Sequence, residues 1–157
     1  MDYIEYKLLN SLQKNARLTN LELAKQVGLS ASPCLRRVKT LEENGVITGY
    51  SAIINQNKVN LSVNVFVQVS LERQSEERLK IFEERIMDYE EVMEAYLMTG
   101  EADYLLRIVV KDLQAYEKFL KNNLTQIKGI ASIRSYFSLK QVTRKYNLPI
   151  VNPKNNK

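Results

Sequence analysis

The sequence lacks histidine entirely and contains one cysteine, Cys34, among its 157 residues. Catalysis by a serine–histidine–aspartate or cysteine–histidine group needs a histidine, and structural zinc clusters need several cysteines or histidines. A disulfide within the chain is impossible. No GxGxxG or GxxxxGK[ST] phosphate loop is present. We therefore expect no enzyme, no catalytic or metal-binding residues, and no cofactor.

Long hydrophobic runs are also missing. No apolar stretch approaches the roughly 20 residues that a membrane-spanning helix needs. Residues 1–7 are acidic and amphipathic, and they contain no apolar core of a signal peptide. With 45% hydrophobic and 26% charged residues, the composition is that of a globular protein. We expect a cytoplasmic protein with no membrane partner.

Charge is distributed unevenly along the chain. Residues 1–55 contain seven Lys/Arg and five Asp/Glu, a net charge of +2. Residues 72–94 contain four and nine, a net charge of −5, and residues 107–157 contain eleven and two, a net charge of +9. Such asymmetry suggests oriented contact with a polyanion or between subunits.

Two amphipathic helices are predicted at the start of the chain. The first covers about residues 2–14, with Asp2 placed to cap it. The second has Thr19 as its N-cap and Glu22 at its third position, which is the spacing of a capping box. Gly28 ends the second helix, because glycine tolerates the left-handed conformation of a helix stop.

A third helix follows after a short turn. Ser30 or Ser32 caps it, and Pro33 is its first residue if Ser32 is the cap. It ends at Asn44-Gly45, and its predicted inner face is Leu35, Val38 and Leu41. Two short helices joined by a turn that contains glycine form a helix-turn-helix, whose second helix enters the DNA major groove.

Three positive charges lie off the apolar face of this third helix. Arg36 and Lys39 suit base edges or phosphate, and Arg37 suits phosphate. The alternative interpretation is an ordinary solvated basic surface. The position of these residues in a helix-turn-helix makes this alternative weaker. The predicted partner is double-stranded DNA, and the predicted DNA-binding residues are Thr19, Ser30, Ser32, Pro33, Arg36, Arg37, Lys39 and Thr40.

The pattern changes from helical to extended after Gly45. Residues 46–54 are typical of a short hairpin or wing, so residues 1–54 are predicted to form a winged helix-turn-helix domain. The polar residues that follow predict a linker over 55–61.

A second domain, of class α+β, is predicted over residues 62–157. Strands are expected at about 63–71, 92–99, 104–110 and 131–139, and helices at about 75–87 and 112–124. This β-α-β-β-α-β order is ferredoxin-like. The predicted inner faces of the helices are Leu79, Phe82 and Ile86 in the first, and Leu113, Tyr116, Leu120 and Leu124 in the second. The sheet's other face is expected to form a subunit interface, with Phe66, Gln68, Ser70, Tyr96, Met98 and Arg107 on it.

Four segments together resemble the Lrp/AsnC family of leucine-responsive, or "feast/famine", transcription regulators. They are Arg17–Ala24, Gly28–Glu42, Gly45–Ala52 and Thr99–Leu106, the last of which is similar to the family's TGxxDYLL element. The resemblance implies a DNA-binding regulator that dimerises through its sheets and assembles to higher oligomers, often octamers. It also implies an amino acid effector, bound between dimers near the turn after the second strand.

The residues of that turn are compatible with an effector site. Gly100 lets backbone approach a ligand closely, and Glu101 or Asp103 could meet an ammonium group. The alternative is a plain tight turn, in which aspartate is common. The predicted effector-binding residues are Thr99, Gly100, Glu101, Asp103 and Tyr104.

Two other functions stay open at this point. Cys34, near two arginines at the start of a helix, could be a thiol sensor with a lowered pKa, or simply a small packed residue. The chain could also be an amino-acid-binding module that regulates an enzyme by protein contact, but such a module does not need a helix-turn-helix.

Overall fold

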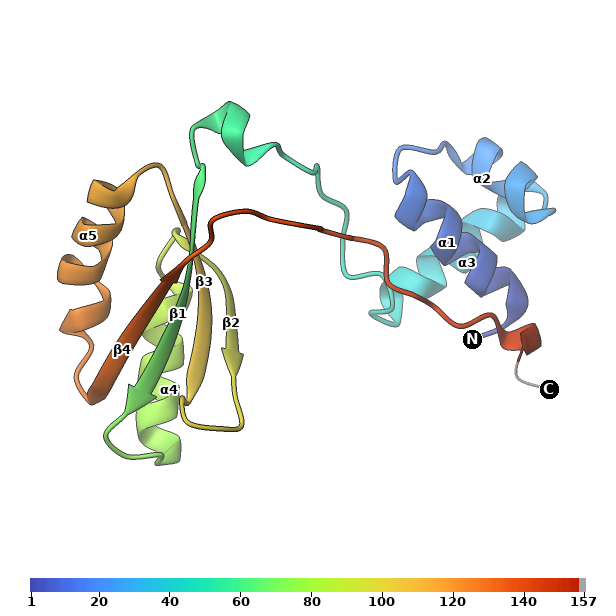
Figure 1. Cartoon of the computed structure of the whole chain (residues 1–157). Coiled ribbons are helices and arrows are strands. Elements are labelled where there is room, and N and C mark those ends of the chain that lie inside the picture. Colours follow the sequence, from blue (N-terminus) through green and yellow to red (C-terminus); the bar gives the residue numbers. More distant parts are fainter. Residues whose placement is uncertain (156–157) are drawn as a thin grey trace. The chain divides into compact units, whose positions relative to one another are not determined.

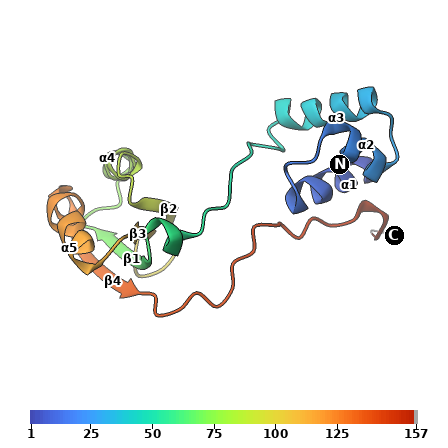
Figure 2. The same ribbon diagram turned by 90° about the horizontal axis from the view of Figure 1, so that it is seen from above.

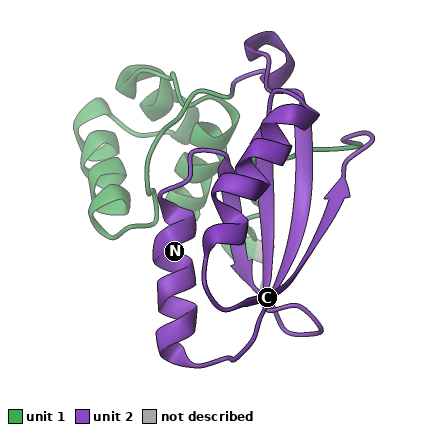
Figure 3. Cartoon of the chain, turned by 90° about the vertical axis from the view of Figure 1, so that its left-hand side faces the viewer, with its two compact units in different colours: residues 1–53, 142–157 green, residues 54–141 purple. Residues whose placement is uncertain are grey.

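The computed structural model describes residues 1–155, which divide into two compact units. The first unit consists of residues 1–53 and the C-terminal segment from Val142 onward, and the second unit consists of residues 54–141 (Figure 3). None of the helices in the described part of the chain is long and apolar enough to cross a membrane.

Three helices form the first unit: α1 (Tyr3–Lys14), α2 (Asn20–Val27) and α3 (Ala31–Glu43) (Figure 1). The predicted caps are confirmed. Asp2 caps α1, and Thr19 caps α2 in a reciprocal capping box with Glu22. Gly28 ends α2 at φ 78°, in the left-handed region that favours glycine. These local signals fix where each helix begins and ends.

The core of the first unit lies between these helices, and its buried members are Leu8, Leu9, Leu23, Ala24, Val27, Cys34 and Leu41. The predicted inner face of α3 is wrong at Leu35, which is 45% exposed. The core-facing positions of α3 are the buried Cys34 and Leu41 and the partly buried Val38, spaced by four and three residues, which places Leu35 one step round the helix. Pro33 is the third residue of α3, since Ser30 is the N-cap.

The predicted hairpin over residues 46–54 is not found. This segment contains no strand, and its large apolar side chains are mostly exposed, Val46, Tyr50, Ile53 and Ile54 among them. Extended residues become a strand only when a neighbouring strand pairs with them, and no described residue of the first unit is in a strand. In this domain, the three helices of the fold are present, and an extended, unpaired segment lies where the hairpin was predicted.

The C-terminal segment packs on the first unit, although the predicted domain boundaries place it in the second. Gln13 of α1 accepts a hydrogen bond from the Leu148 backbone N–H at 2.6 Å and donates one to the Leu148 carbonyl at 3.3 Å. Ile150 packs against the core of the unit, and the Lys154 ammonium lies 3.8 Å from the centroid of the Tyr3 ring. The segment also contains the short 3₁₀ helix η3 (Pro153–Asn155).

The second unit is a four-stranded antiparallel sheet with two helices on one face (Figures 1 and 2). Its elements are η1 (Gln56–Val59), β1 (Val63–Leu71), α4 (Glu76–Met87), β2 (Val92–Leu97), β3 (Tyr104–Val110), α5 (Leu113–Asn122), η2 (Leu124–Gln126) and β4 (Ile130–Phe137). The strand order is β2-β3-β1-β4, so β1 pairs with both β3 and β4. The predicted β-α-β-β-α-β order is confirmed.

Buried and more exposed side chains alternate along β1, so one face of this strand contributes to the core. Val65, Val67 and Val69 are 0% exposed and face the helices, where Phe82 of α4 and Phe119 of α5 meet them. The predicted inner face of α4 agrees with the structure at Phe82 and Ile86, with Leu79 partly buried. The predicted inner face of α5 is wrong at Leu113, which is 63% exposed; the buried residues of α5 are Tyr116 and Phe119.

The other face of the sheet carries Phe66, Gln68, Ser70 and Tyr96, as expected, around Arg107. Arg107 is 8% exposed. Its guanidinium pairs with Glu94 of β2 at 2.8 Å and donates to the side chains of Asn64 and Gln56. The Gln56 bond ties η1, within the predicted linker, to the sheet.

Candidate nucleic-acid interface and effector pocket

The helix-turn-helix positions α3 through a small number of local contacts. The backbone N–H of Leu29 donates to Ala24, so α2 closes tightly at Gly28 before α3 begins. The side-chain amide of Asn20, at the start of α2, donates to the Ala31 carbonyl at 2.8 Å. These bonds hold the first turn of α3 against α2, and the buried Cys34 and Leu41 hold the rest of it against the core.

The outward face of α3 combines cations, hydroxyls and one apolar side chain. Ser32, Leu35, Arg36, Lys39 and Thr40 are all exposed. Thr40 donates its hydroxyl proton to the Arg36 carbonyl at 3.0 Å, which is a bond within the helix. Within residues 1–155, the charged groups of Arg36 and Lys39 make no hydrogen bond or ion pair, so both are available to a polyanion.

Arg37 faces a different neighbour. Its guanidinium forms an ion pair with Asp2, the N-cap residue of α1, and both side chains are partly exposed. The Glu5 backbone N–H, followed by the Arg37 guanidinium, lowers the pKa of Asp2 below its ordinary value. Arg37 therefore ties α3 to the start of α1, and a phosphate would have to compete with Asp2 for it.

The remaining predicted DNA-binding residues lie at helix starts. The Thr19 hydroxyl accepts from the Glu22 backbone N–H and donates to the Glu22 carboxylate, so capping already uses it. Ser30 is exposed, and its side chain makes no capping hydrogen bond. Pro33 is partly buried in the first turn of α3.

Cys34 does not have the environment of a reactive thiol. Its side chain is 0% exposed within the core of the first unit, and burial raises its pKa. The predicted lowering of this pKa by the nearby arginines is wrong, because both guanidinium groups lie outside the core while the sulfur faces inward. Cys34 is a packed residue, and the thiol-sensor alternative loses its physical basis.

A small cavity lies beside the turn between β2 and β3. Its volume is about 240 Å³, and its lining residues are Gln68, Met98, Thr99, Glu101, Ala102, Tyr104 and Leu105. Gln68 and Leu105 pair across β1 and β3, and Tyr96 pairs with Leu105, so the cavity opens on the sheet face that carries no helix. Thr99 and Glu101 are exposed at its edge.

Asp103 and Tyr104 point their polar groups away from that cavity. The Asp103 carboxylate is buried and accepts hydrogen bonds from the Leu71 backbone N–H at 2.6 Å and from the Gln74 side chain at 2.5 Å. The Tyr104 hydroxyl donates to Glu83 of α4 at 2.7 Å. The carboxylate of Asp103 thus serves the structure of the turn, as the plain-turn alternative holds, and is not placed to meet an ammonium group.

Glu101 and Gly100 retain the properties that an effector site needs. Gly100 has φ 139°, a conformation that side chains disfavour, and a Cβ built on it would meet nothing within 4 Å. Glu101 is almost fully exposed, and its carboxylate lies 3.7 Å from Arg134 of β4. Glu101 is therefore the accessible carboxylate of this turn, within reach of a ligand in the cavity.

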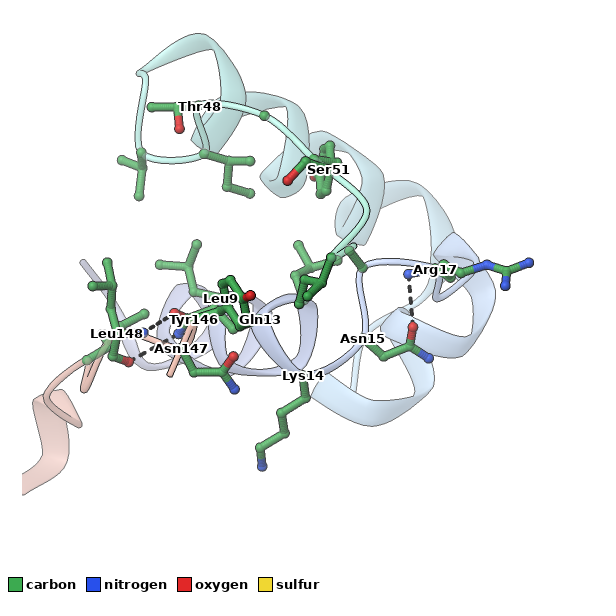
Figure 4. Close-up of a pocket in the computed structure, with 18 of the residues that line it drawn as sticks. Leu9, Gln13, Lys14, Asn15, Arg17, Thr48, Ser51, Tyr146, Asn147 and Leu148 are labelled. Carbon is green, nitrogen blue, oxygen red and sulfur yellow. Dashed lines mark hydrogen bonds between the residues drawn. The ribbon is translucent and has the colours of Figure 1, made fainter. Parts of the chain in front are cut away.

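A larger apolar cavity, of about 1130 Å³, opens within the first unit (Figure 4). Leu9 and Leu12 of α1 line one side, the extended segment from Val46 to Ile53 lines another, and the C-terminal segment closes it through Tyr146 and Leu148. Figure 4 shows the two hydrogen bonds between Gln13 and Leu148 at its edge. The sequence patterns gave no sign of this cavity, because its walls come from opposite ends of the chain.

Sequence reasoning also missed five residues of the two candidate sites. Gln68, Met98, Ala102 and Leu105 line the effector cavity, and Leu35 is exposed on α3. The period of two along β1 already places Gln68 on the open face, so that signal was available. Cys34 and Leu35 are adjacent apolar residues of α3, and periodicity alone does not decide which of them is buried and which is exposed.

Comparison with known protein families supports both units. Residues 1–48 match the family described as winged helix-turn-helix DNA-binding, and residues 64–148 match the Lrp/AsnC ligand binding domain. The second match alone covers more than half of the chain.

Similar proteins of known name and structure are transcription regulators. The chain is 50% identical to the Bkd operon transcriptional regulator of Pseudomonas aeruginosa over 90% of this chain and 93% of that one. It is 39% identical to the leucine-responsive regulatory protein of Escherichia coli over 96% and 92%.

Two crystal structures are also close in fold. A transcriptional regulator of Neisseria meningitidis, solved in complex with L-methionine, has a TM-score of 0.89 and 37% identity, over 95% of this chain and 96% of that one. An AsnC family regulator of Agrobacterium tumefaciens has a TM-score of 0.89 and 42% identity, over 95% and 97%.

Proposed function

The chain belongs to the Lrp/AsnC family of transcription regulators, and we propose that it binds DNA through α3 and responds to a free amino acid. The observation that carries the DNA-binding part is the exposed face of α3, where Arg36 and Lys39 have no ion-pair partner among residues 1–155. Since DNA is the target, we place the protein in the cytoplasm. A module that acts only on an enzyme would have no use for this face.

Salt dependence tests the DNA contact. Binding of the full-length protein to its own upstream DNA should weaken steeply with salt, because each phosphate contact releases counterions. Lys39→Ala should flatten the log–log slope by about one unit. Lys118→Ala, at an exposed position of α5, is the matched control and should leave the slope unchanged. A salt-insensitive complex would contradict this role for α3.

Sequence preference tests Arg36 separately. A bidentate contact of arginine with guanine is worth about 1–3 kcal/mol of discrimination, so Arg36→Ala should change the preferred sequence in a selection from random DNA. Loss of affinity without a change in preference would assign Arg36 to phosphate contact.

The effector part of the proposal rests on the chemistry of the 240 Å³ cavity. Glu101 offers a carboxylate to an ammonium group, Gln68 and Thr99 offer hydrogen-bonding groups, and Met98 and Leu105 offer apolar contact to a side chain. A zwitterion with an apolar side chain suits this set. The L-methionine complex of the Neisseria meningitidis regulator supports the same class of ligand.

Calorimetric titration of the full-length protein with each standard amino acid tests this site. We expect heat from one or a few apolar amino acids, and its loss in Glu101→Gln. Glu117→Gln, exposed on α5, is the control and should bind normally. Normal binding by Glu101→Gln would show that this carboxylate does not contact the ligand. The absence of heat from every amino acid would contradict the proposal that a free amino acid is the effector.

We also propose that the open face of the sheet forms a homodimer that assembles further, with an octamer as one such assembly. Phe66, Tyr96 and Tyr136 are 38%, 52% and 50% exposed on this face, around the buried Arg107. Apolar patches of this kind mark interfaces. Phe66→Glu should lower the sedimentation coefficient of the full-length protein, whereas Met87→Glu, on the exposed side of α4, should not. Equal sedimentation of both variants would contradict the interface.

A further inference from the structure

Leu35 is the one large apolar side chain that α3 exposes. It is 45% exposed, whereas Cys34 beside it is 0% exposed and Leu41 on the same helix is 4% exposed. The core contacts of α3 run through the face of Cys34 and Leu41. Leu35 therefore contributes little to the packing of the first unit, and its presence on the outer face calls for a different role.

The neighbours of Leu35 on the helix surface are polar and basic. Ser32 is three residues before it and Lys39 four residues after it, which places all three on one stripe of α3. Arg36 adjoins this stripe. The side chains of Ser32, Arg36 and Lys39 are exposed, and the described residues provide no ion-pair partner to either cation.

This combination decides which partner suits Leu35. A protein surface that covered Leu35 would also have to compensate the two adjacent cations, whereas the DNA backbone supplies negative charge on both sides of the groove. The major groove also presents an apolar group between those phosphates, namely the 5-methyl group of thymine. An exposed leucine between a hydroxyl and cations matches that arrangement.

We propose that Leu35 determines sequence specificity by contacting the 5-methyl group of a thymine in the major groove. The proposal rests on the DNA-binding function of α3 described above. Arg36 and Lys39 would supply affinity and hydrogen bonds, and Leu35 would supply a preference at one base pair that neither cation can read. Cytosine lacks this methyl group, and the purines present a different pattern of acceptors and donors.

Replacing thymine by deoxyuridine tests the contact directly, because the two bases differ only in the 5-methyl group. Affinities of the full-length protein are measured for a footprinted site in which each thymine is replaced in turn. For the wild-type protein, we expect one position per half-site to lose about fourfold in affinity, the order of burying one methyl group. At this position Leu35→Ala should show no further loss from deoxyuridine.

Leu113→Ala is the matched control, since Leu113 is an exposed leucine of α5 in the other unit and its variant should respond to deoxyuridine like the wild type. The scan of the wild-type protein needs no variant, so a scan in which no thymine position loses affinity would overturn the proposal even if Leu35→Ala folds poorly. Equal effects of deoxyuridine on the wild type and Leu35→Ala at every thymine would overturn the proposal for Leu35 alone. Failure of the wild type to bind DNA in a salt-dependent way would overturn the DNA-binding function itself.

Discussion

The two units of this protein are built from contacts of very different range in sequence. In the first unit, the C-terminal segment makes long-range contacts, but the caps join residues three apart and the three helices pack on their near neighbours in the chain. In the second unit, β1 pairs with β3 and β4, so Val65 lies beside Ile108 and Phe137. The buried apolar residues of the described chain number seven in the first cluster and fourteen in the second. The first unit is thus locally specified but thinly packed, and the second depends on long-range pairing around a larger core.

Core truncation gives the largest expected effect and tests whether the units are separate. Phe82→Ala should lower the free energy of unfolding of the second unit by about 3–5 kcal/mol, because Phe82 is 1% exposed under the sheet. Leu8→Ala should cost the first unit about 2–5 kcal/mol. Hydrogen exchange in denaturant reports on each unit, and each variant should affect its own unit. A shift of both units by either variant would show that they unfold together.

Removal of the Asp103 carboxylate has the next largest expected effect. Asp103→Ala leaves the buried Leu71 N–H and the Gln74 amide without an acceptor, so the second unit should lose about 1–3 kcal/mol of unfolding free energy. Glu101→Ala, in the same turn but almost fully exposed, should change it by less than about 0.5 kcal/mol. Chemical denaturation measures both. If the two variants are equally stable, Asp103 is not the structural residue of this turn.

Helix caps allow a smaller, matched comparison of the two units. Thr19→Ala removes the cap of α2, and Ser75→Ala removes the cap of α4, each at a cost of about 0.5–2 kcal/mol. Since α2 supports the first turn of α3, only Thr19→Ala should also weaken DNA binding at constant salt. Equal DNA affinity of both variants would mean that α2 does not position α3.

The smallest expected effect is the pH dependence of the free energy of unfolding, which near neutral pH should not change. Burial and the hydrogen bond to Glu83 raise the pKa of Tyr104 well above its ordinary value of 10.0, and burial and Glu42 raise the pKa of Tyr50 to about 12. The folded protein then holds these protons more tightly than the unfolded chain does. Stability is therefore complete below pH 10 and falls as the pH rises above it.

The variant Tyr104→Phe separates the two tyrosines. In this variant, the second unit should no longer lose stability as the pH rises above 10, whereas the loss of stability due to Tyr50 in the first unit should remain. Denaturation curves at increasing pH, with tyrosinate absorbance as a second signal, measure it. An unchanged alkaline profile of the second unit in Tyr104→Phe would refute the assignment.

Prediction from the sequence succeeded best where the signal was local. The cap at Asp2, the capping box at Thr19 and the strand alternation of β1 each involve side chains within a few residues of one another, and the structure has all of them. The segment 46–54 shows the limit, because its alternation indicates a strand but the described residues of its unit provide no strand to pair with it. The functional interpretation succeeded because the helix-turn-helix and the TGxxDYLL-like turn are local patterns too.

By itself, the sequence determined the order of the elements, the helix ends and the class of protein, since each follows from short-range hydrogen bonding or a fixed period. The tertiary structure alone decided which way some individual side chains outside β1 face. Leu35 is exposed because Cys34 occupies the core, and the Asp103 carboxylate turns inward because the Leu71 N–H, 32 residues away, needs an acceptor. The C-terminal segment meets Gln13 across 135 residues. No local pattern encodes such choices, because the free energy of burying a group depends on which distant neighbours reach it.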